Sequence, residues 1–185
     1  MRLTIVTLAA LMACGSAAAE GWREYTYPEF SFAINFPAKP KVERTVYKAV
    51  DGTSVPARTY SLEQDGKIYA VTVADFSSTG LDDTNVFDLA IRTLGEKAAV
   101  NEDILVLLDK NIGHQLSLSG NDNSHSNVAL YFYQHRLYQA QGIVLPSNGD
   151  ASSGDGIRFT QSLHFTNKAP DSFGLETTFG SSGRF

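Results

Sequence analysis

Residues 30–36 read Phe-Ser-Phe-Ala-Ile-Asn-Phe, so large apolar side chains alternate with small or polar ones without a break. Successive side chains of a β-strand point to opposite faces of its sheet, and a period of two therefore indicates a half-buried strand. Pro37 ends the segment, because proline cannot donate a hydrogen bond to a neighbouring strand. We expect a strand here whose buried face is formed by Phe30, Phe32, Ile34 and Phe36.

Short β-rich segments separated by turn residues continue through most of the chain. Asp65-Gly66 lies between two of them and favours a type I′ hairpin turn, which needs positive φ at both central residues. The segment 69–74 is apolar on both faces, so we expect it to lie inside a sheet and to be covered on both sides. The predicted strands are 22–27, 30–36, 44–50, 55–63, 69–74, 104–108, 115–118, 127–133 and 137–145, the last two joined by a turn at 134–136.

Two segments have the apolar spacing of helices. Residues 82–84 (Asp-Asp-Thr) offer N-cap oxygens, and the apolar positions that follow predict a helix up to Val100. A second, shorter helix is predicted around 157–163, where Phe159 and Leu163 would share the buried face. Together these elements predict an α+β fold, with a mainly antiparallel sheet of seven to nine strands and flanking helices.

The first nineteen residues have the layout of a secretory signal peptide. Arg2 precedes an apolar run over 3–13, and an A-x-A motif follows at 17–19. The run is too short to span a bilayer, which takes about 20 residues. A second interpretation stays open, because residues 11–16 (Leu-Met-Ala-Cys-Gly-Ser) resemble a lipobox in which Cys14 would become the lipidated first residue. We therefore expect a periplasmic or exported protein, tethered to a membrane by lipid in the second case.

Either cleavage leaves the folded domain without a free thiol, because Cys14 is the only cysteine. A disulfide framework is thus excluded, and the stability must come from an apolar core. Residues 20–167 are long enough for one such domain. Residues 168–185 contain linker-like Pro, Gly and Ser and are expected to form a flexible tail.

The charge excludes two classes of partner. Without Arg2 the fifteen Lys and Arg become fourteen, against twenty Asp and Glu, and the net charge is −6. These charges are interspersed and form no basic run that could contact phosphates. Nucleic acid and anionic lipid surfaces are therefore not expected as partners.

Four segments of the chain form a recognisable series, namely 27–37, 68–76, 135–139 and 158–163. In this order they resemble the PsbP-like/Mog-type α/β/α sandwich family, especially uncharacterised bacterial exported members. The resemblance covers residues 22–165 and implies a sheet flanked by helices and an accessory binding role rather than chemistry. Plant and cyanobacterial members are extrinsic subunits of photosystem II, and the Mog branch binds a small GTPase. No functional residue of either branch can be matched here, so none is carried over.

No catalytic or metal motif stands out. His114 and His125 flank a predicted strand and could approach each other as a metal pair, but no H-x-x-x-H or H-E-x-x-H pair and no cysteine completes a zinc site. The polar loops 121–124 and 150–155 offer oxygens for calcium but lack the bidentate glutamate of an EF-hand, so they fit a turn and a helix cap. No G-x-S-x-G motif is present. We expect neither a cofactor nor a metal.

Aromatic residues are the remaining candidates for a functional surface. Most should be core, but Tyr131, Tyr133 and Tyr138 are expected to be partly exposed and to anchor a partner, since tyrosine tolerates a wet edge. The sequence thus favours a non-enzymatic envelope protein, an accessory or assembly factor acting through protein–protein contact. The alternative is a small-ligand or ion-binding module with a pocket between sheet and helix or in a polar loop. A hydrolase without a recognisable motif is the third possibility.

Overall fold

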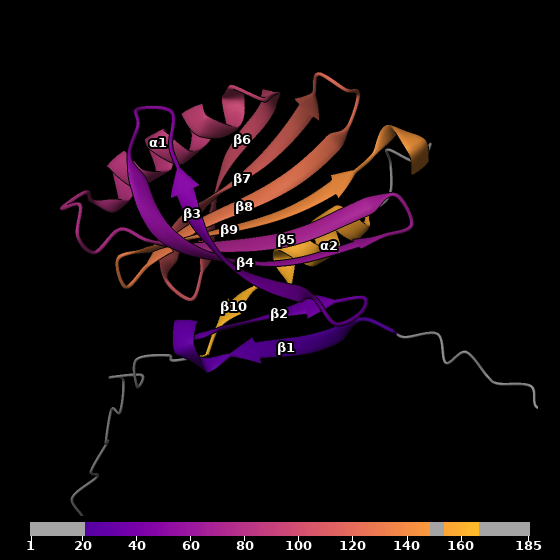
Figure 1. Cartoon of the computed structure of the whole chain (residues 1–185), viewed down its shortest axis with the longest axis horizontal. Coiled ribbons are helices and arrows are strands. Elements are labelled where there is room, and N and C mark those ends of the chain that lie inside the picture. Colours follow the sequence, from indigo (N-terminus) through magenta and orange to yellow (C-terminus); the bar gives the residue numbers. More distant parts are fainter. Residues whose placement is uncertain (1–20, 149–153, 167–185) are drawn as a thin grey trace, which may run out of the picture.

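The computed structural model describes residues 21–148 and 154–166, which form ten strands and two helices (Figure 1). Seven strands make one twisted sheet in which all neighbours are antiparallel. In spatial order they are β3 (Lys41–Lys48), β4 (Ser54–Gln64), β5 (Lys67–Asp75), β9 (Arg136–Val144), β8 (His125–Tyr133), β7 (Asn111–Gly120) and β6 (Ala98–Leu108). The α+β fold class predicted from the sequence is confirmed.

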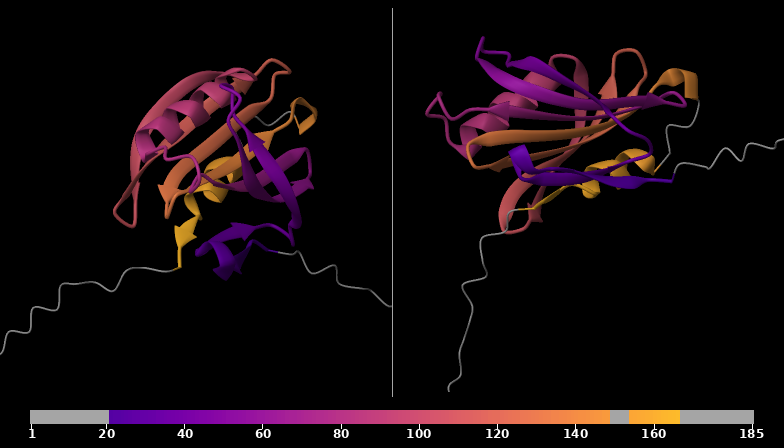
Figure 2. Two further views of the ribbon diagram at one scale, coloured as in Figure 1. Left: turned by 60° about the vertical axis from the view of Figure 1, so that its left-hand side comes forward. Right: turned by 60° about the horizontal axis from the view of Figure 1, so that its bottom comes forward.

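A second, three-stranded antiparallel sheet is formed by β1 (Arg23–Tyr27), β2 (Phe32–Phe36) and β10 (His164–Phe165). It lies with α2 (Asp155–Gln161) on one side of the large sheet, whereas α1 (Asp83–Gly95) lies across the other side (Figure 1, Figure 2). The N-terminal strands are therefore a separate layer, and β2 is its central strand.

Two apolar clusters hold these layers together. The first lies between the small sheet, α2 and the large sheet, and it is mostly aromatic. The second lies under α1, which buries Val86, Phe87, Leu89 and Ala90 on the large sheet. The main members of the first cluster are Phe32, Ile34, Phe36, Tyr60, Tyr69, Val71, Val73, Tyr131, Tyr138, Phe159, Leu163 and Phe165. Phe159 and Leu163 are both buried here, but the prediction that they share a helix face is wrong, because α2 ends at Gln161 and Leu163 lies beyond it.

The hairpin turns follow the local sequence. Asp65 and Gly66 have φ of 51° and 68°, so the positive φ expected at both positions is confirmed. Gln134 and His135, with φ of 51° and 59°, form the turn between β8 and β9, and Arg136 already belongs to β9. Asp82 caps α1 by accepting a hydrogen bond from the Asn85 backbone N–H at 2.9 Å, as the N-cap pattern predicted.

Several boundaries predicted from the sequence are wrong. The strands expected over 104–108 and 115–118 are longer and span Ala98–Leu108 and Asn111–Gly120. The strand expected from Phe30 begins at Phe32, because Pro28–Phe30 form a 3₁₀ turn and Ser31 has φ of 54°. The helix expected up to Val100 ends at Gly95, and Ala98 already pairs with Gly120 in β6. Leu94 and Ala98 both pack on the same apolar cluster, one from the helix and one from the strand. Their spacing of four residues therefore resembled that of a continuing helix.

The proposed signal peptide with Cys14 and the tail 168–185 lie outside the described residues. Within residues 21–148 and 154–166, no helix is both long and apolar enough to cross a bilayer.

Candidate functional site

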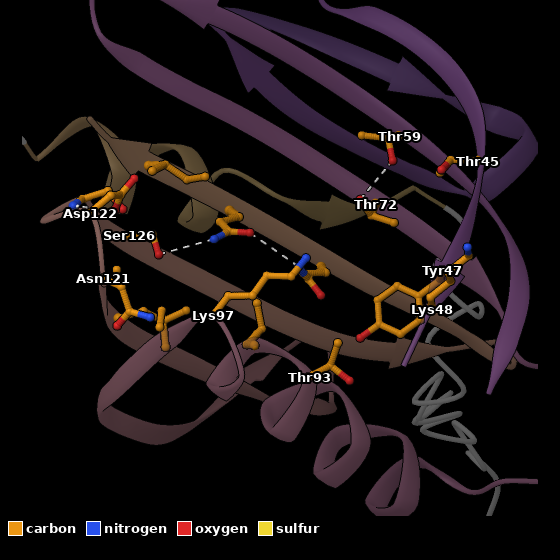
Figure 3. A pocket seen from close by; sticks show the side chains of 18 of the residues that line it. Thr45, Tyr47, Lys48, Thr59, Thr72, Thr93, Lys97, Asn121, Asp122 and Ser126 are labelled. Carbon is orange, nitrogen blue, oxygen red and sulfur yellow. Dashed lines mark hydrogen bonds between the residues drawn. The ribbon is translucent and has the colours of Figure 1, made fainter. Parts of the chain in front are cut away.

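A pocket of about 620 Å³ lies between the large sheet and the C-terminal end of α1 (Figure 3). We call it the α1-face pocket. Its floor comes from β4, β5, β8 and β9, and its walls come from β3, the end of α1 and the turn at 120–124 between β7 and β8. The volume falls within the range of about 300–1,000 Å³ that is typical of small-molecule sites.

The floor of the α1-face pocket is polar, although it lies in the middle of a sheet. The register places Thr59, Thr72 and Gln139 in one row across β4, β5 and β9. The two threonine hydroxyls are 3.1 Å apart, and the Gln139 amide donates to Gln141 Oε1 at 3.5 Å. Gln141 in turn donates to Ser126 Oγ at 3.3 Å. The expectation that 69–74 is covered on both sides is therefore wrong at Thr72, which is half-buried and lines this pocket.

Two polar atoms beside this floor are buried and make no hydrogen bond to the described part of the chain, namely Tyr47 Oη and Gln139 Oε1. Thr93 adjoins Tyr47, but its hydroxyl already donates to Leu89 O at 2.7 Å and accepts from Val50 N at 3.0 Å. Burial raises the pKa of Tyr47 to about 12, against a smaller lowering effect of Thr93.

The wall of the α1-face pocket carries charge. Lys97 lines it from the turn after α1, and Lys48 adjoins it from β3 (Figure 3). Asp122 is the acidic residue of the lining, and its Oδ1 accepts a hydrogen bond from the Ser124 backbone N–H at 3.0 Å. The hydrogen bonds to Ser124 lower the pKa of Asp122. Lys97 is thus the cation at the pocket wall, and the carboxylate of Asp122 is already engaged by its own turn.

A second feature lies at the free edge of the large sheet. Leu105 and Leu107 of β6 and Ile112 of β7 are 71%, 71% and 59% exposed. Leu107 pairs with Ile112, and Leu105 with His114, so all three apolar side chains share the α1-bearing face. We call Leu105, Leu107 and Ile112 the apolar ridge. Large exposed apolar side chains that adjoin one another are typical of interaction sites.

The two edges of the large sheet differ in how they are protected. β3 carries Lys41, Glu43, Arg44 and Lys48, and charged side chains disfavour edge-to-edge pairing. β6 has an irregularity between Val100 and Glu102, but its residues 104–108 are Ile-Leu-Val-Leu-Leu. Within the described residues, β6 pairs with β7 alone.

The tyrosines expected to form an exposed partner surface do not form one. Tyr138 is fully buried and donates a hydrogen bond to Phe30 O at 2.7 Å. Tyr131 is 8% exposed, and Tyr133 is half-buried, with its ring centroid 4.4 Å from that of Phe165. The prediction is wrong for Tyr131 and Tyr138, because the small sheet covers this part of the large sheet, whereas Tyr133 is partly exposed as expected.

The histidines predicted as a possible metal pair are separated. His125 pairs with Ser119, five residues along β7 from His114, which corresponds to about 17 Å of strand. His114 Nδ1 lies 2.7 Å from Asp103 Oδ1, and its ring contacts Phe87. Among residues 21–148 and 154–166, no group of three or more His, Cys, Asp or Glu side chains is placed to hold a metal ion.

The two loops considered for calcium have different outcomes. In 121–124, Asp122 bonds the backbone of its own turn, which confirms the turn interpretation. Of 150–155, residues 150–153 lie outside the described residues, while Asp155 begins α2 and pairs with Lys67 at 2.5 Å. The sequence reasoning missed Thr59, Thr72 and Gln139, although polar residues inside predicted strands were a signal.

No protein-family model matches the chain, and comparison with curated proteins finds no relative. Among solved structures, the chain is similar to cyanobacterial PsbP from Synechocystis sp. PCC 6803, with a TM-score of 0.55 and 14% identity over 84% of this chain and 98% of that chain. A Pseudomonas aeruginosa protein of unknown function gives a TM-score of 0.40 and 5% identity over 63% of this chain and 94% of that chain. The first similarity, together with the sheets and helices above, shows that this chain has a PsbP-like fold.

Proposed function

We propose that this chain is a non-enzymatic accessory protein of the cell envelope that acts by contact with a partner protein. The apolar ridge carries the proposal, because three large apolar side chains are exposed to solvent beside an edge of β6 that pairs with no strand of the described residues. The PsbP-like fold supports it as an analogy, since similarity of fold alone does not determine function.

The partner that fits this edge is an extended segment that pairs with β6. Such a segment would satisfy the outward backbone groups of β6 and cover Leu105 and Leu107 with alternate side chains. Glu102 and Asp103 directly precede the apolar stretch and are exposed. We therefore expect the segment to be apolar, with a basic residue near one end.

The test is photo-crosslinking in cells that express the tagged full-length chain. A photoreactive residue replaces Leu105 in one strain and Val42, on the opposite edge strand β3, in the other. Val42 is 49% exposed and provides a matched control. We expect Leu105 to give one discrete crosslinked partner that Val42 does not give. The Leu107→Ser/Ile112→Ser variant should lose the crosslinked partner obtained from Leu105. The control variant Val46→Ser, on β3, should keep it.

Other outcomes would overturn the proposal. Identical crosslinks from both edges would indicate non-specific proximity. Crosslinks from Leu105 to the chain itself would mean that the edge is covered internally or by a second copy. Because the three ridge residues are exposed, their substitution by serine should leave the melting temperature nearly unchanged, and circular dichroism checks this before crosslinking.

Export is the second part of the proposal and is tested by the intact mass of the mature protein. A chain that begins at Glu20 indicates cleavage at the A-x-A motif. A chain that begins at a diacylated or triacylated Cys14 indicates a lipoprotein, whose anchor would hold the domain at a membrane. Recovery of the uncleaved chain from the cytosol would contradict both.

A further inference from the structure

We propose that the α1-face pocket binds a small organic anion that carries several hydroxyl groups, such as a sugar acid or a sugar phosphate. The site is separate from the apolar ridge, because the pocket includes Gly120 at one end of β7 whereas Ile112 lies at the other end. The inference therefore goes beyond the proposed contact with a partner protein.

The first argument is the chemistry of the floor. A sheet face under a helix is normally apolar, and the same face of this sheet is apolar where α1 packs on Leu116 and Val128. In the α1-face pocket that surface instead presents Thr59, Thr72 and Gln139 in one row. Hydroxyls and amides both donate and accept hydrogen bonds, which is the capacity needed to bind a hydroxyl-rich ligand.

The second argument is the hydrogen-bonding capacity that the described residues leave unused. Gln139 Oε1 and Tyr47 Oη are buried and unpartnered, and a buried polar group without a partner is costly. Tyr47 is itself 9% exposed. An occupant that donates and accepts accounts for both atoms.

The third argument is charge. The chain as a whole is acidic, with a net charge of −5. The α1-face pocket, however, is lined by Lys97 (Figure 3), and Asp122 is held in its own turn. Lys48 adjoins the pocket as well, but the neighbouring Tyr47 side chain is the one that points into it, so the Lys48 side chain lies on the opposite face of β3. Within the described residues, no ion pair is formed by either lysine. An anionic group beside the Lys97 ammonium would be attracted, and hydrogen bonds to a charged group are about twice as strong as neutral ones.

The experiment is isothermal titration calorimetry of the purified mature chain with four probes. Glucuronate and glucose 6-phosphate carry both the hydroxyls and the charge, whereas glucose lacks the charge and inorganic phosphate lacks the carbon-bound hydroxyls. We expect 1:1 binding of at least one sugar anion, at least tenfold tighter than glucose and than inorganic phosphate. Binding of glucuronate alone or of glucose 6-phosphate alone distinguishes a carboxylate ligand from a phosphate ligand.

Two variants place the binding in the pocket. Lys97→Met removes the charge and keeps the stem, and Thr72→Val removes one hydroxyl at constant shape. Each should weaken binding about tenfold, which is the loss of one hydrogen bond of about 1.4 kcal/mol. The matched controls are Lys39→Met and Thr26→Val, both at exposed positions outside the pocket lining. They should leave the affinity unchanged.

Several results would overturn the inference. These are no heat with any sugar anion at 10 mM, equal affinity for inorganic phosphate and glucose 6-phosphate, or affinities that neither Lys97→Met nor Thr72→Val changes. Circular dichroism of each variant confirms that it is folded, so that lost binding is not lost structure. If the crosslinking at Leu105 fails while these titrations succeed, the proposed contact with a partner protein is contradicted and the proposed ligand site is supported.

Discussion

Gly142 of β9 lies against Gly156 of α2, backbone to backbone. A Cβ built on Gly142 would be 2.5 Å from the Gly156 Cα and 3.1 Å from the Gly156 O. Side chains therefore have no room between this strand and this helix. The contact seats α2 on the large sheet, where Phe159 enters the aromatic cluster.

We expect Gly142→Ala to lower the free energy of unfolding by about 1–3 kcal/mol, because the new methyl group would clash with the backbone of Gly156, which cannot rotate away as a side chain could. Urea unfolding followed by circular dichroism measures the change. Gly95→Ala is the matched control, since its nearest neighbour is Val100 Cγ2 at 4.0 Å. It lies at the end of α1, where alanine favours the helix, so this control should be neutral or stabilising by up to about 1 kcal/mol. An equal loss in both variants would contradict the packing argument.

The hydrogen bond from Tyr138 to Phe30 O links the large sheet to the segment that precedes β2. Tyr138→Phe keeps the ring but leaves the carbonyl of Phe30 without this donor. We expect a loss of about 1–3 kcal/mol in the free energy of unfolding, the usual cost of an unsatisfied buried group. Tyr25→Phe is the control, because Tyr25 is half-buried and its hydroxyl makes no hydrogen bond within the described residues. If Tyr138→Phe changed the free energy of unfolding as little as Tyr25→Phe does, the Phe30 carbonyl would be hydrogen-bonded to water in the variant.

The turn at Asp65-Gly66 and the cap at Asp82 could be predicted because a few neighbouring residues determine them. The burial of Tyr138 could not be predicted, because its partner Phe30 is 108 positions away in the chain. Alternation gives two faces to a strand but does not say which face another layer will cover.

The candidate site could not be predicted either, because it also depends on residues that are far apart in the chain. Thr59 and Thr72 are ordinary strand residues when each is considered alone. They form one polar row with Gln139 only through the register of β4, β5 and β9. The apolar stretch 104–108 was correctly predicted as strand, but its position at the sheet edge depends on the order of all seven strands.

Asp75 is expected to contribute to stability in a way that acid removes. Its carboxylate accepts a hydrogen bond from the Ser77 backbone N–H at 3.0 Å and lies 3.8 Å from Arg136 Nε. Hydrogen bonds to Ser77, and to a lesser extent the charge of Arg136, lower the pKa of Asp75 below its usual 3.8. A lowered folded-state pKa stabilises the fold above pH 3.8, and this contribution is lost as the pH falls through the folded value.

Asp75→Asn should therefore be less stable than the natural chain at pH 7, and the difference should shrink below pH 3.8. Urea unfolding at pH 7, 4 and 3 measures it. Asp88→Asn, at an exposed position on α1, is the control. A stability difference that stays constant from pH 7 to pH 3 would show that Asp75 acts through packing and not through its charge.

We expect tyrosine ionisation to lower the stability of the fold at high pH. Burial raises the pKa of Tyr27, Tyr47, Tyr69 and Tyr138 to about 12, above the usual 10.0. Between pH 10 and 12 the unfolded chain loses protons that the folded chain keeps, so the free energy of unfolding falls as the pH rises. We expect tyrosinate absorbance at 295 nm to rise together with the loss of near-ultraviolet circular dichroism. In 6 M guanidinium the same chain should titrate near pH 10. Native dichroism persisting after all eight tyrosines have ionised would contradict the buried aromatic layer between the two sheets.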